Sequence, residues 1–343
     1  MKSILHICTL DKFIPDFINF SRKHLSHYEQ LYITYNTYKK YPYDLKDDAK
    51  HIDNKLFRYL KINYELYKKD VVLIHGLFDP YLMLLLFIQP WLLKKCRWLV
   101  WGGDVYHLHK LYDGKRSFKK FIREYVIKHM GYIVTSIDGD YAAIKSMYKA
   151  QGKRINVFTY PASLYQLIKQ NPRKDKRVNI LVGNSADPSN HHIDVFQILR
   201  DQDLCNIRVI VPLSYGDINY KEMICKAGVD ILGEAFEPLV DFIQYDEYLK
   251  ILSNIDIAIF NHDRQQALSN TRVLLGMGKK VYMRPGLSST IQLEKLGLVI
   301  HSLESFELNL NQVELSRNSE IIKKFYSEGN LKNNLIKVFE ANK

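Results

Sequence analysis

Small and polar side chains follow the apolar run 180–182, where the pattern predicts that a strand ends and a helix soon begins. Gly183 lets a ligand approach the backbone closely, and the free N–H groups of a helix N-terminus favour an anionic phosphate. A plain cap by Ser189 or Asn190 explains one residue, but not the length and polarity of the whole loop. The loop contains neither a dinucleotide fingerprint nor a Walker lysine. We therefore predict that it binds a diphosphate through Gly183, Asn184, Ser185, Ser189 and Asn190.

Two further strand ends in the second half carry polar residues. After the apolar run 257–260, Arg264 can pair with a phosphate, and amide side chains can bond sugar hydroxyls. A solvent-facing cap is the alternative for this loop. After the run 208–213, Tyr215 could stack on a base or ribose, although tyrosines more often serve packing. The ligand site is accordingly expected to include Ser214, Tyr215, Arg264, Gln265, Gln266, Ser269 and Asn270.

Two strand ends in the first half could present a second reactant. His75-Gly76 closes one apolar run, and Trp101-Gly-Gly103-Asp104-Val-Tyr106 closes another. The glycines would admit an acceptor, and Asp104 or His75 could take the proton of an attacking hydroxyl. A carboxylate beside two glycines is also a common helix cap, so both interpretations of Asp104 stay open.

No cluster of His, Cys and carboxylates has the spacing of metal ligands. Two Asp-x-Asp strings, at 138–140 and 201–203, border helical patterns and are interpreted as caps or turns. We expect no metal and no cofactor. Arg264, the Ser and Asn donors and helix dipoles would instead stabilise a departing diphosphate.

The chain of 343 residues has a net charge of +12, much of it in one region. Residues 94–154 contain fourteen Lys and Arg against five Asp and Glu. A basic region beside the apolar stretch 80–93 suits an anionic membrane surface or a lipid diphosphate, and a solvated lysine-rich surface is the alternative. The residues expected to face acceptor or membrane are Gly76, Trp101, Gly103, Tyr106, Lys115, Arg116, Lys119, Lys120 and Arg123.

The sequence predicts a cytoplasmic protein, at most peripheral to a membrane. The longest apolar stretch, 81–93, is interrupted by Gln89-Pro90 and is shorter than the about 20 residues that a spanning helix needs. The N-terminus lacks the apolar stretch and cleavage site of a signal peptide. Four scattered cysteines without a C-x-x-C pair fit buried thiols in a reducing compartment.

The elements that position these loops alternate between strand and helix in both halves, which predicts two doubly wound α/β domains. In the first half, strands are expected at 3–8, 30–35, 71–75, 98–101, 132–135 and 156–160. In the second half they are expected at 179–182, 208–213, 230–232, 256–260 and 280–283. The predicted domains are 1–170 and 178–319, joined by a polar linker, and a closing helix occupies 320–343. Ligands of such sheets bind beyond the carboxyl ends of the strands.

The motif Gly183-Asn184-Ser185-x-Asp187-x-Ser189-Asn190-x-His192 resembles a known family, the TDP-N-acetylfucosamine:lipid II N-acetylfucosaminyltransferases of glycosyltransferase family 56. The segment 209–216, Asp246-x-Tyr248-Leu, Arg264-Gln265-Gln266, Trp101-Gly-x-Asp104-x-Tyr106 and His75-Gly-x-Phe78-x-Pro80 resemble the same family.

The resemblance implies a GT-B fold, in which two Rossmann-like domains face each other. It also implies a TDP-sugar donor in the C-terminal domain, with Tyr248 among the donor-binding residues, and an undecaprenyl-diphosphate-linked glycan as acceptor. The sugar would be N-acetylfucosamine-like, and the product would be enterobacterial common antigen, O-antigen or capsule. The enzyme would be peripheral on the inner face of the cytoplasmic membrane. The paired glutamates that many GT-B transferases carry eight residues apart are replaced here by Asp263 and Thr271.

Two other classes stay open. A sugar-nucleotide epimerase can share the two-domain plan, and donor turnover without acceptor would favour it. A basic nucleic-acid-binding protein would fit the pI of about 9.2, but the sequence has no recognisable recognition module. Salt-sensitive binding to duplex DNA would favour that class.

Overall fold

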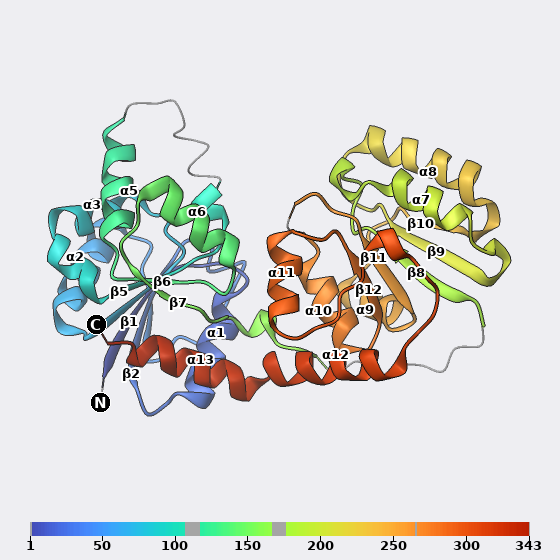
Figure 1. Cartoon of the computed structure of the whole chain (residues 1–343). Helices are drawn as coiled ribbons and strands as arrows, with labels where there is room; N and C mark the ends of the chain where they lie inside the picture. Colours follow the sequence, from blue (N-terminus) through green and yellow to red (C-terminus); the bar gives the residue numbers. More distant parts are fainter. Residues whose placement is uncertain (1, 107–116, 167–175, 265, 343) are drawn as a thin grey trace. The chain divides into compact units, whose positions relative to one another are not determined.

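The structure is a computed structural model that describes residues 2–106, 117–166, 176–264 and 266–342. The chain forms two compact units (Figure 1). Unit 1 comprises Met1–Leu164 together with Glu328–Lys343, and unit 2 comprises Tyr165–Ser327. The C-terminal segment therefore returns to the first unit.

Unit 1 is built on a seven-stranded sheet with the order β3-β2-β1-β4-β5-β6-β7, and every neighbouring pair is parallel. Its strands are β1 (Ser3–Thr9), β2 (Glu29–Tyr35), β3 (Ala49–His51), β4 (Val71–His75), β5 (Cys96–Leu99), β6 (Tyr132–Val134) and β7 (Lys153–Ile155). The central strands are buried over nearly their whole length, because helices cover both faces of the sheet.

The helices of unit 1 are α1 (Ile14–His24), α2 (Lys55–Lys68), α3 (Pro80–Ile88), the 3₁₀ helix η1 (Pro90–Lys95), α5 (Phe118–His129), α6 (Asp138–Tyr148) and α13 (Glu328–Glu340). Side chains of α2, α3, α5 and α6 join one core cluster with the strands. On the other face α1 and α13 contribute Phe17 and Phe339, whose rings contact His6 of β1. Caps fix where several helices begin, since Asn54, Asp79 and Ser117 accept bonds from first-turn N–H groups.

Unit 2 is built on a five-stranded parallel sheet with the order β10-β9-β8-β11-β12. Its strands are β8 (Val178–Val182), β9 (Ile207–Pro212), β10 (Phe236–Leu239), β11 (Ile257–Phe260) and β12 (Lys280–Met283). Its helices are α7 (His192–Arg200), α8 (Ile218–Leu232), α9 (Tyr245–Ser253), α10 (Leu268–Gly276), α11 (Ser288–Lys295) and α12 (Gln312–Phe325). Parallel pairing brings the carboxyl ends of β8, β9, β11 and β12 to one edge, where the polar loops meet.

Several elements differ from the sequence prediction. Residues 230–232 are the end of helix α8, and the strand at this edge is Phe236–Leu239. Ile224, Gly228 and Leu232 are buried four residues apart, so the apolar triplet continues a helical period. The strand expected at 156–160 is instead β7, at Lys153–Ile155, and the short strand β3 was not predicted.

The apolar stretch 80–93 and the predicted closing helix each divide into two elements. Helix α3 stops at Ile88, because Pro90 cannot continue the α-helical bonding and begins a 3₁₀ helix instead. The predicted closing helix is two helices, of which α12 lies in unit 2 and α13 in unit 1. Most of the predicted linker at 170–177 lies outside the described residues. Within the described part of the chain, no helix has both the length and the apolar character that crossing a membrane requires.

Candidate functional site

The loop after β8 is a tightly closed turn that depends on a glycine. Gly183 has a φ of +68°, which is a left-handed conformation that favours glycine. A Cβ atom at this position would lie 2.5 Å from Nε2 of His192 and 2.7 Å from Oδ1 of Asn190. Any larger residue would therefore push apart the two side chains on which the loop closes.

Asn190 holds the inside of this loop together. Its side chain is fully buried, and its Oδ1 accepts the Asn184 N–H at 3.0 Å. Its Nδ2 donates to the carbonyl oxygens of Ser185 at 3.2 Å and Asp187 at 2.9 Å. From the neighbouring strand end, His262 Nε2 lies 2.9 Å from the same Oδ1. The Asn190 side chain, which the sequence predicts to bind the ligand, is therefore engaged by the loop itself.

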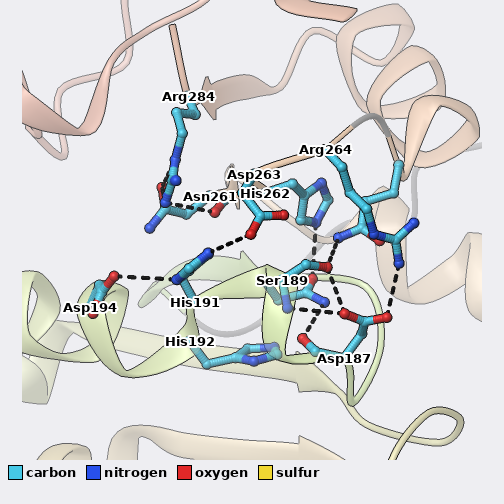
Figure 2. A network of polar contacts seen from close by, with 12 residues as sticks. Asp187, Ser189, His191, His192, Asp194, Asn261, His262, Asp263, Arg264 and Arg284 are labelled. Carbon is cyan, nitrogen blue, oxygen red and sulfur yellow. Dashed lines mark hydrogen bonds and ion pairs between the residues drawn. The ribbon is translucent and has the colours of Figure 1, made fainter.

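A surface network joins the loop after β8 to the loop after β11 (Figure 2). Asp187 accepts the Ser189 N–H at 3.0 Å and the Ser189 hydroxyl at 2.6 Å, and its other oxygen pairs with Arg264 at 2.9 Å. Gln266 donates to the Ser189 hydroxyl at 2.8 Å. The hydrogen bonds from Ser189, followed by the charge of Arg264, hold the pKa of Asp187 below its usual range. Two predicted donor-site residues, Ser189 and Arg264, thus belong to one cluster.

Histidines connect the same two loops. His191 has a left-handed φ of 50° and lies between Asp263, at 3.2 Å, and Asp194, at 3.7 Å (Figure 2). His262 is buried, and burial lowers its pKa to about 4. Burial likewise lowers the pKa of His192 to about 3, with its Nδ1 lying 3.1 Å from the Tyr220 hydroxyl. At neutral pH the two buried imidazoles are therefore uncharged.

A pocket of about 310 Å³ opens beside the loop after β8. It is lined by Asn184, Pro212, Ser214, Tyr215, Leu239, Phe242, Ile243, Tyr245, Tyr248, Ser269 and Asn270. Six predicted donor-site residues are among these: Asn184, Ser214, Tyr215, Tyr248, Ser269 and Asn270. The structure therefore brings together residues that the sequence places on four separate segments.

Polar contacts within the pocket orient its aromatic rings. Asn184 donates to the Tyr215 hydroxyl at 2.9 Å, and Asn270 donates to the Tyr248 hydroxyl at 3.0 Å. Burial raises the pKa of Tyr248, so its hydroxyl stays protonated at neutral pH. Tyr215 and Phe242 are 61% and 80% exposed, which leaves broad apolar surface at the rim. Such a lining, apolar with a few convergent polar groups, is typical of small-molecule sites.

Helix α10 begins at this pocket without a side-chain cap. Its N-cap residue, Ala267, has a left-handed φ of 55° and makes no capping side-chain bond. Ser269 and Asn270 lie in the first turn and line the pocket. The N–H groups of that turn, with the positive end of the helix dipole, are suited to an anion. Helix α7 also begins without a side-chain cap, at His191.

In unit 1, Asp104 does not present a free carboxylate. Its side chain is fully buried, and it accepts bonds from Leu77 N–H at 2.9 Å, Trp98 Nε1 at 2.6 Å and Trp101 N–H at 3.0 Å. Burial raises its pKa while these bonds oppose that rise. These contacts identify Asp104 as a residue that positions the loops after β4 and β5, and they do not support the predicted role as general base.

His75 is likewise fully buried at the end of β4. Its Nε2 lies 3.1 Å from His6 Nδ1, and its Nδ1 lies 2.8 Å from the Tyr160 hydroxyl. Trp101 Nε1 donates to the same hydroxyl at 2.7 Å. Burial lowers the pKa of His75 well below its ordinary value. Both ring nitrogens are therefore engaged inside unit 1, which argues against direct proton transfer from a substrate.

The two predicted glycines of these loops differ: Gly76 allows close packing, whereas Gly103 is exposed. Gly76 has a φ of +75°, and a Cβ there would lie 2.5 Å from the Phe78 ring. Gly103 is exposed, and Trp101 is partly exposed beside it. Tyr106 is 44% exposed and donates to Asp140 at 2.7 Å. Trp101, Gly103 and Tyr106 thus form the accessible part of this strand edge.

The predicted basic cluster is divided by the structure. Lys119 is exposed, and Lys120 lies 3.9 Å from Glu124. Arg123 is corrected, because it is 1% exposed and donates to the backbone oxygens of Leu77 and Asp104. A guanidinium with several donors can satisfy backbone carbonyls in a core without facing solvent. Lys115, Arg116 and Gln265 lie outside the described residues.

The Asp-x-Asp strings lie at helix starts, as the sequence suggests. Asp138 is the first residue of α6 and pairs with Arg154 at 2.8 Å. Asp203 caps a 3₁₀ helix by accepting the Cys205 N–H at 3.1 Å. Over the ranges that the structure describes, no group of three or more His, Cys, Asp or Glu is arranged to hold a metal ion.

Sequence reasoning missed part of the site. Phe242 and Tyr245 line the pocket, but they belong to a segment with no glycine or phosphate-like motif. Asp187 was given only as part of a motif and His262 was not singled out, although they join the loops after β8 and β11. Phe242 follows β10, a strand that the sequence did not predict, so no strand-end signal pointed to it.

Solved structures share this two-sheet plan across nearly the whole chain. WaaG, a glycosyltransferase involved in lipopolysaccharide biosynthesis, is 10% identical with a TM-score of 0.55, and the match covers 99% of this chain and 100% of that chain. HepE from Anabaena, solved in complex with UDP and glucose, is 9% identical with a TM-score of 0.61, covering 98% and 99%. A putative UDP-N-acetylglucosamine 2-epimerase from Listeria monocytogenes is 13% identical with a TM-score of 0.51, covering 97% and 94%. These similarities show a GT-B fold, which transferases and the epimerase have in common.

The GT-B fold together with a family match defines the class of this protein, which is a glycosyltransferase of the GT-B type. The sequence model of the 4-alpha-L-fucosyltransferases, glycosyl transferase group 56, matches residues 20–302. The chain belongs to this family. The predicted family, fold and enzyme class are thereby confirmed, and the family match decides between transferase and epimerase where the fold alone does not.

Proposed function

We propose that unit 2 binds a TDP-sugar and that the enzyme transfers its sugar to an undecaprenyl-diphosphate-linked glycan. The sugar is N-acetylfucosamine-like, and the product belongs to a bacterial surface polysaccharide. The observation that carries this proposal is the pocket of about 310 Å³ directly beside the uncapped start of α10. A nucleotide-diphosphate sugar needs an aromatic or apolar base site adjoining an anion site, and these two features adjoin here.

The pocket suits a thymidine. Tyr215 and Tyr245 are exposed rings on which a planar base can stack. Pro212, Leu239 and Phe242 offer the apolar surface that the thymine methyl group would contact. The Asn270 amide and the Ser269 hydroxyl can bond the polar groups of base or ribose. HepE, of the same fold, was solved with UDP and glucose, which supports a pyrimidine diphosphate for this fold without identifying the base.

The diphosphate fits beyond this pocket. First-turn N–H groups of α10 and the side chain of Arg264 would hold it, and the same groups would stabilise the negative charge on the departing TDP. Arg264 is 57% exposed in its pair with Asp187. An exposed pair of this kind is worth at most about 1 kcal/mol, so Arg264 can turn to a phosphate at little cost. In this proposal the transfer needs neither a metal nor a cofactor.

The acceptor would meet the accessible strand edge of unit 1, formed by Trp101, Gly103 and Tyr106. Asp104 and His75 hold this edge in shape and are proposed as positioning residues. A lipid-linked acceptor requires the enzyme to work at the inner face of the cytoplasmic membrane. Lys119, exposed on α5, is one basic residue that an anionic surface would attract.

A thermal-shift screen tests the donor. A ligand that binds only the folded state raises the melting temperature, so TDP should raise it more than UDP, and GDP should have little effect. The test variant is Phe242→Ser, which removes pocket surface at an 80% exposed position without disturbing the core and should therefore respond less to TDP. An equal response to all three nucleotides, or a TDP response unchanged in the variant, contradicts the proposed base site. Transfer to a synthetic polyprenyl-diphosphate glycan then tests the acceptor directly.

A further inference from the structure

Helix α2 has two apolar faces instead of one. Ile62 and Leu66 are buried in the core of unit 1. On the opposite side, Leu56, Phe57, Leu60, Tyr64 and Tyr67 are exposed by 50% to 69%. At about 100° per residue these five side chains fall within an arc of about 100°. An ordinary surface helix carries polar residues on its exposed side, whereas α2 exposes five apolar side chains there.

The exposed apolar surface continues onto the next helix along the sheet. Tyr81, Leu84 and Ile88 of α3 are exposed, as is Trp91 of η1. Tyr59 of α2 contacts Tyr81 with ring centroids 5.6 Å apart, and Gln89 donates to Asn63 at 2.8 Å. Figure 1 shows α2 and α3 next to each other on the same side of the sheet. We call this joint surface the α2–α3 face.

The α2–α3 face accounts for a large share of the molecule's exposed hydrophobic side chains. With Phe118 and Phe121 of the adjoining α5, it holds half of the large hydrophobic residues that are exposed within the described part of the chain. Contiguous apolar surface of this extent on a folded protein usually marks a protein or membrane contact.

The exposed charges on the helices that form the face are basic. Lys55 lies over the Tyr81 ring at 5.5 Å, and Lys68 lies over the Tyr64 ring at 4.3 Å. Lys94 is exposed shortly after Trp91. The single acidic residue of α2, Glu65, is buried and pairs with Lys61 at 2.6 Å. The segments 80–88 and 90–95 contain no Asp or Glu.

This chemistry selects the partner. Exposed Leu, Phe and Ile together with Tyr, Trp and nearby Lys make up the composition of an interfacial helix on anionic lipid. A symmetric contact with a second copy would bring the lysines of both copies together, which is unfavourable without matching carboxylates.

We propose that the α2–α3 face inserts shallowly into an anionic lipid bilayer. This inference deepens the proposed function, since it names the surface that would bring the enzyme to a lipid-linked acceptor. It assigns membrane contact chiefly to α2, whereas the sequence alone indicated the apolar stretch 80–93 and the basic region 94–154 beside it.

Vesicle binding tests the proposal. Leu56→Ser/Leu60→Ser removes two leucines from the α2–α3 face, and Val229→Ser/Val313→Ser removes two similarly exposed apolar residues from unit 2. On vesicles of phosphatidylglycerol and phosphatidylethanolamine, the leucine variant should bind about 10- to 100-fold more weakly, whereas the valine control should bind like wild type. Both should keep the wild-type circular dichroism spectrum and melting temperature. Equal binding by the leucine variant and wild type overturns the proposal.

Tryptophan fluorescence provides a second, independent measurement. Of the three tryptophans, Trp91 is 57% exposed, Trp98 is fully buried and Trp101, in the loop after β5, is partly exposed. Brominated lipids should quench the emission of the bound protein, and Trp91→Phe should abolish that quenching while binding persists. Quenching that persists in Trp91→Phe overturns the assigned orientation.

Failure of this inference can be distinguished from failure of the proposed function. The leucine variant should keep the wild-type melting shift with TDP, because its changes lie in unit 1 and the pocket lies in unit 2. If the wild-type protein binds vesicles but shows no melting shift with TDP, the proposed TDP-sugar donor is wrong and the proposed membrane contact of the α2–α3 face is unaffected. Light scattering that shows a dimer, lost in the leucine variant, would instead assign the face to a second copy and overturn the proposal.

Discussion

Replacing Asn190 by alanine removes the side chain on which the loop after β8 closes. Five contacts disappear: two that its Oδ1 makes with Asn184 N–H and His262, and three that its Nδ2 makes with the carbonyl oxygens of Ser185 and Asp187 and with the Ser185 hydroxyl. A buried polar group left without a partner costs about 1–3 kcal/mol, and a loop near the surface recovers part of that cost through water. We expect Asn190→Ala to lower the free energy of unfolding by about 2–4 kcal/mol.

The loss should reach the ligand as well. Asn184 lines the pocket, and its backbone is fixed by Asn190. TDP should therefore bind Asn190→Ala at least about tenfold more weakly, which corresponds to about 1.4 kcal/mol. Urea unfolding followed by circular dichroism measures the stability, and isothermal titration measures the affinity.

Asn206→Ala is the matched control for this experiment. Asn206 is exposed in the same unit and donates only locally, to Asp203 at 2.7 Å. Its replacement should change stability by less than about 0.5 kcal/mol, as is usual for surface positions. If the two alanine variants unfold and bind TDP alike, Asn190 does not organise the loop, and the description of the site given above is refuted.

Three further outcomes follow from the site. Arg264→Ala should leave the melting temperature within about 1 °C of wild type, because its pair with Asp187 is exposed. The same variant should lower kcat by about 10²–10³ if Arg264 stabilises the leaving diphosphate. An unchanged rate in steady-state transfer assays would remove Arg264 from the site. Tyr248→Phe deletes the hydroxyl bonded to Asn270 and should weaken TDP binding about five- to tenfold by titration, with little change in stability, and equal affinity would place the base elsewhere. His262 has its pKa lowered to about 4 by burial, so the unfolded chain binds the extra proton between pH 6.5 and 4. The contribution of His262 to the free energy of unfolding should be fully present above pH 6.5 and should fall by on the order of 3 kcal/mol as the pH drops through that window. The free energy of unfolding of His262→Gln should fall less steeply. Parallel pH profiles of the two proteins in urea unfolding would contradict this.

Much of the fold could be predicted because its signals are local. The strands Val71–His75 and Lys280–Met283 appear where the apolar runs predict them. The error at 230–232 arose because a three-residue apolar run has no distinguishing period of its own. The actual edge strand, Phe236–Leu239, is only partly buried and includes a proline, so its sequence pattern is weak.

The candidate site could be predicted in place but not in role. Polar loops at strand ends were expected, and Asn184, Tyr215 and Asn270 do line one pocket. Arg123 was expected on a basic surface because sequence shows charge but not burial. Its donors in fact serve two backbone carbonyls in the core of unit 1.

The sequence by itself determined two parallel α/β units, the strand-end glycines and the family, because periodicity, turn chemistry and motif spacing are properties of neighbouring residues. Only the tertiary structure decided which polar groups are consumed inside the protein and which remain for a ligand. Asn190 and His262 are 72 residues apart in the chain and meet only when β8 and β11 pair. The apolar arc of α2 is likewise meaningful only once the sheet has taken its opposite face.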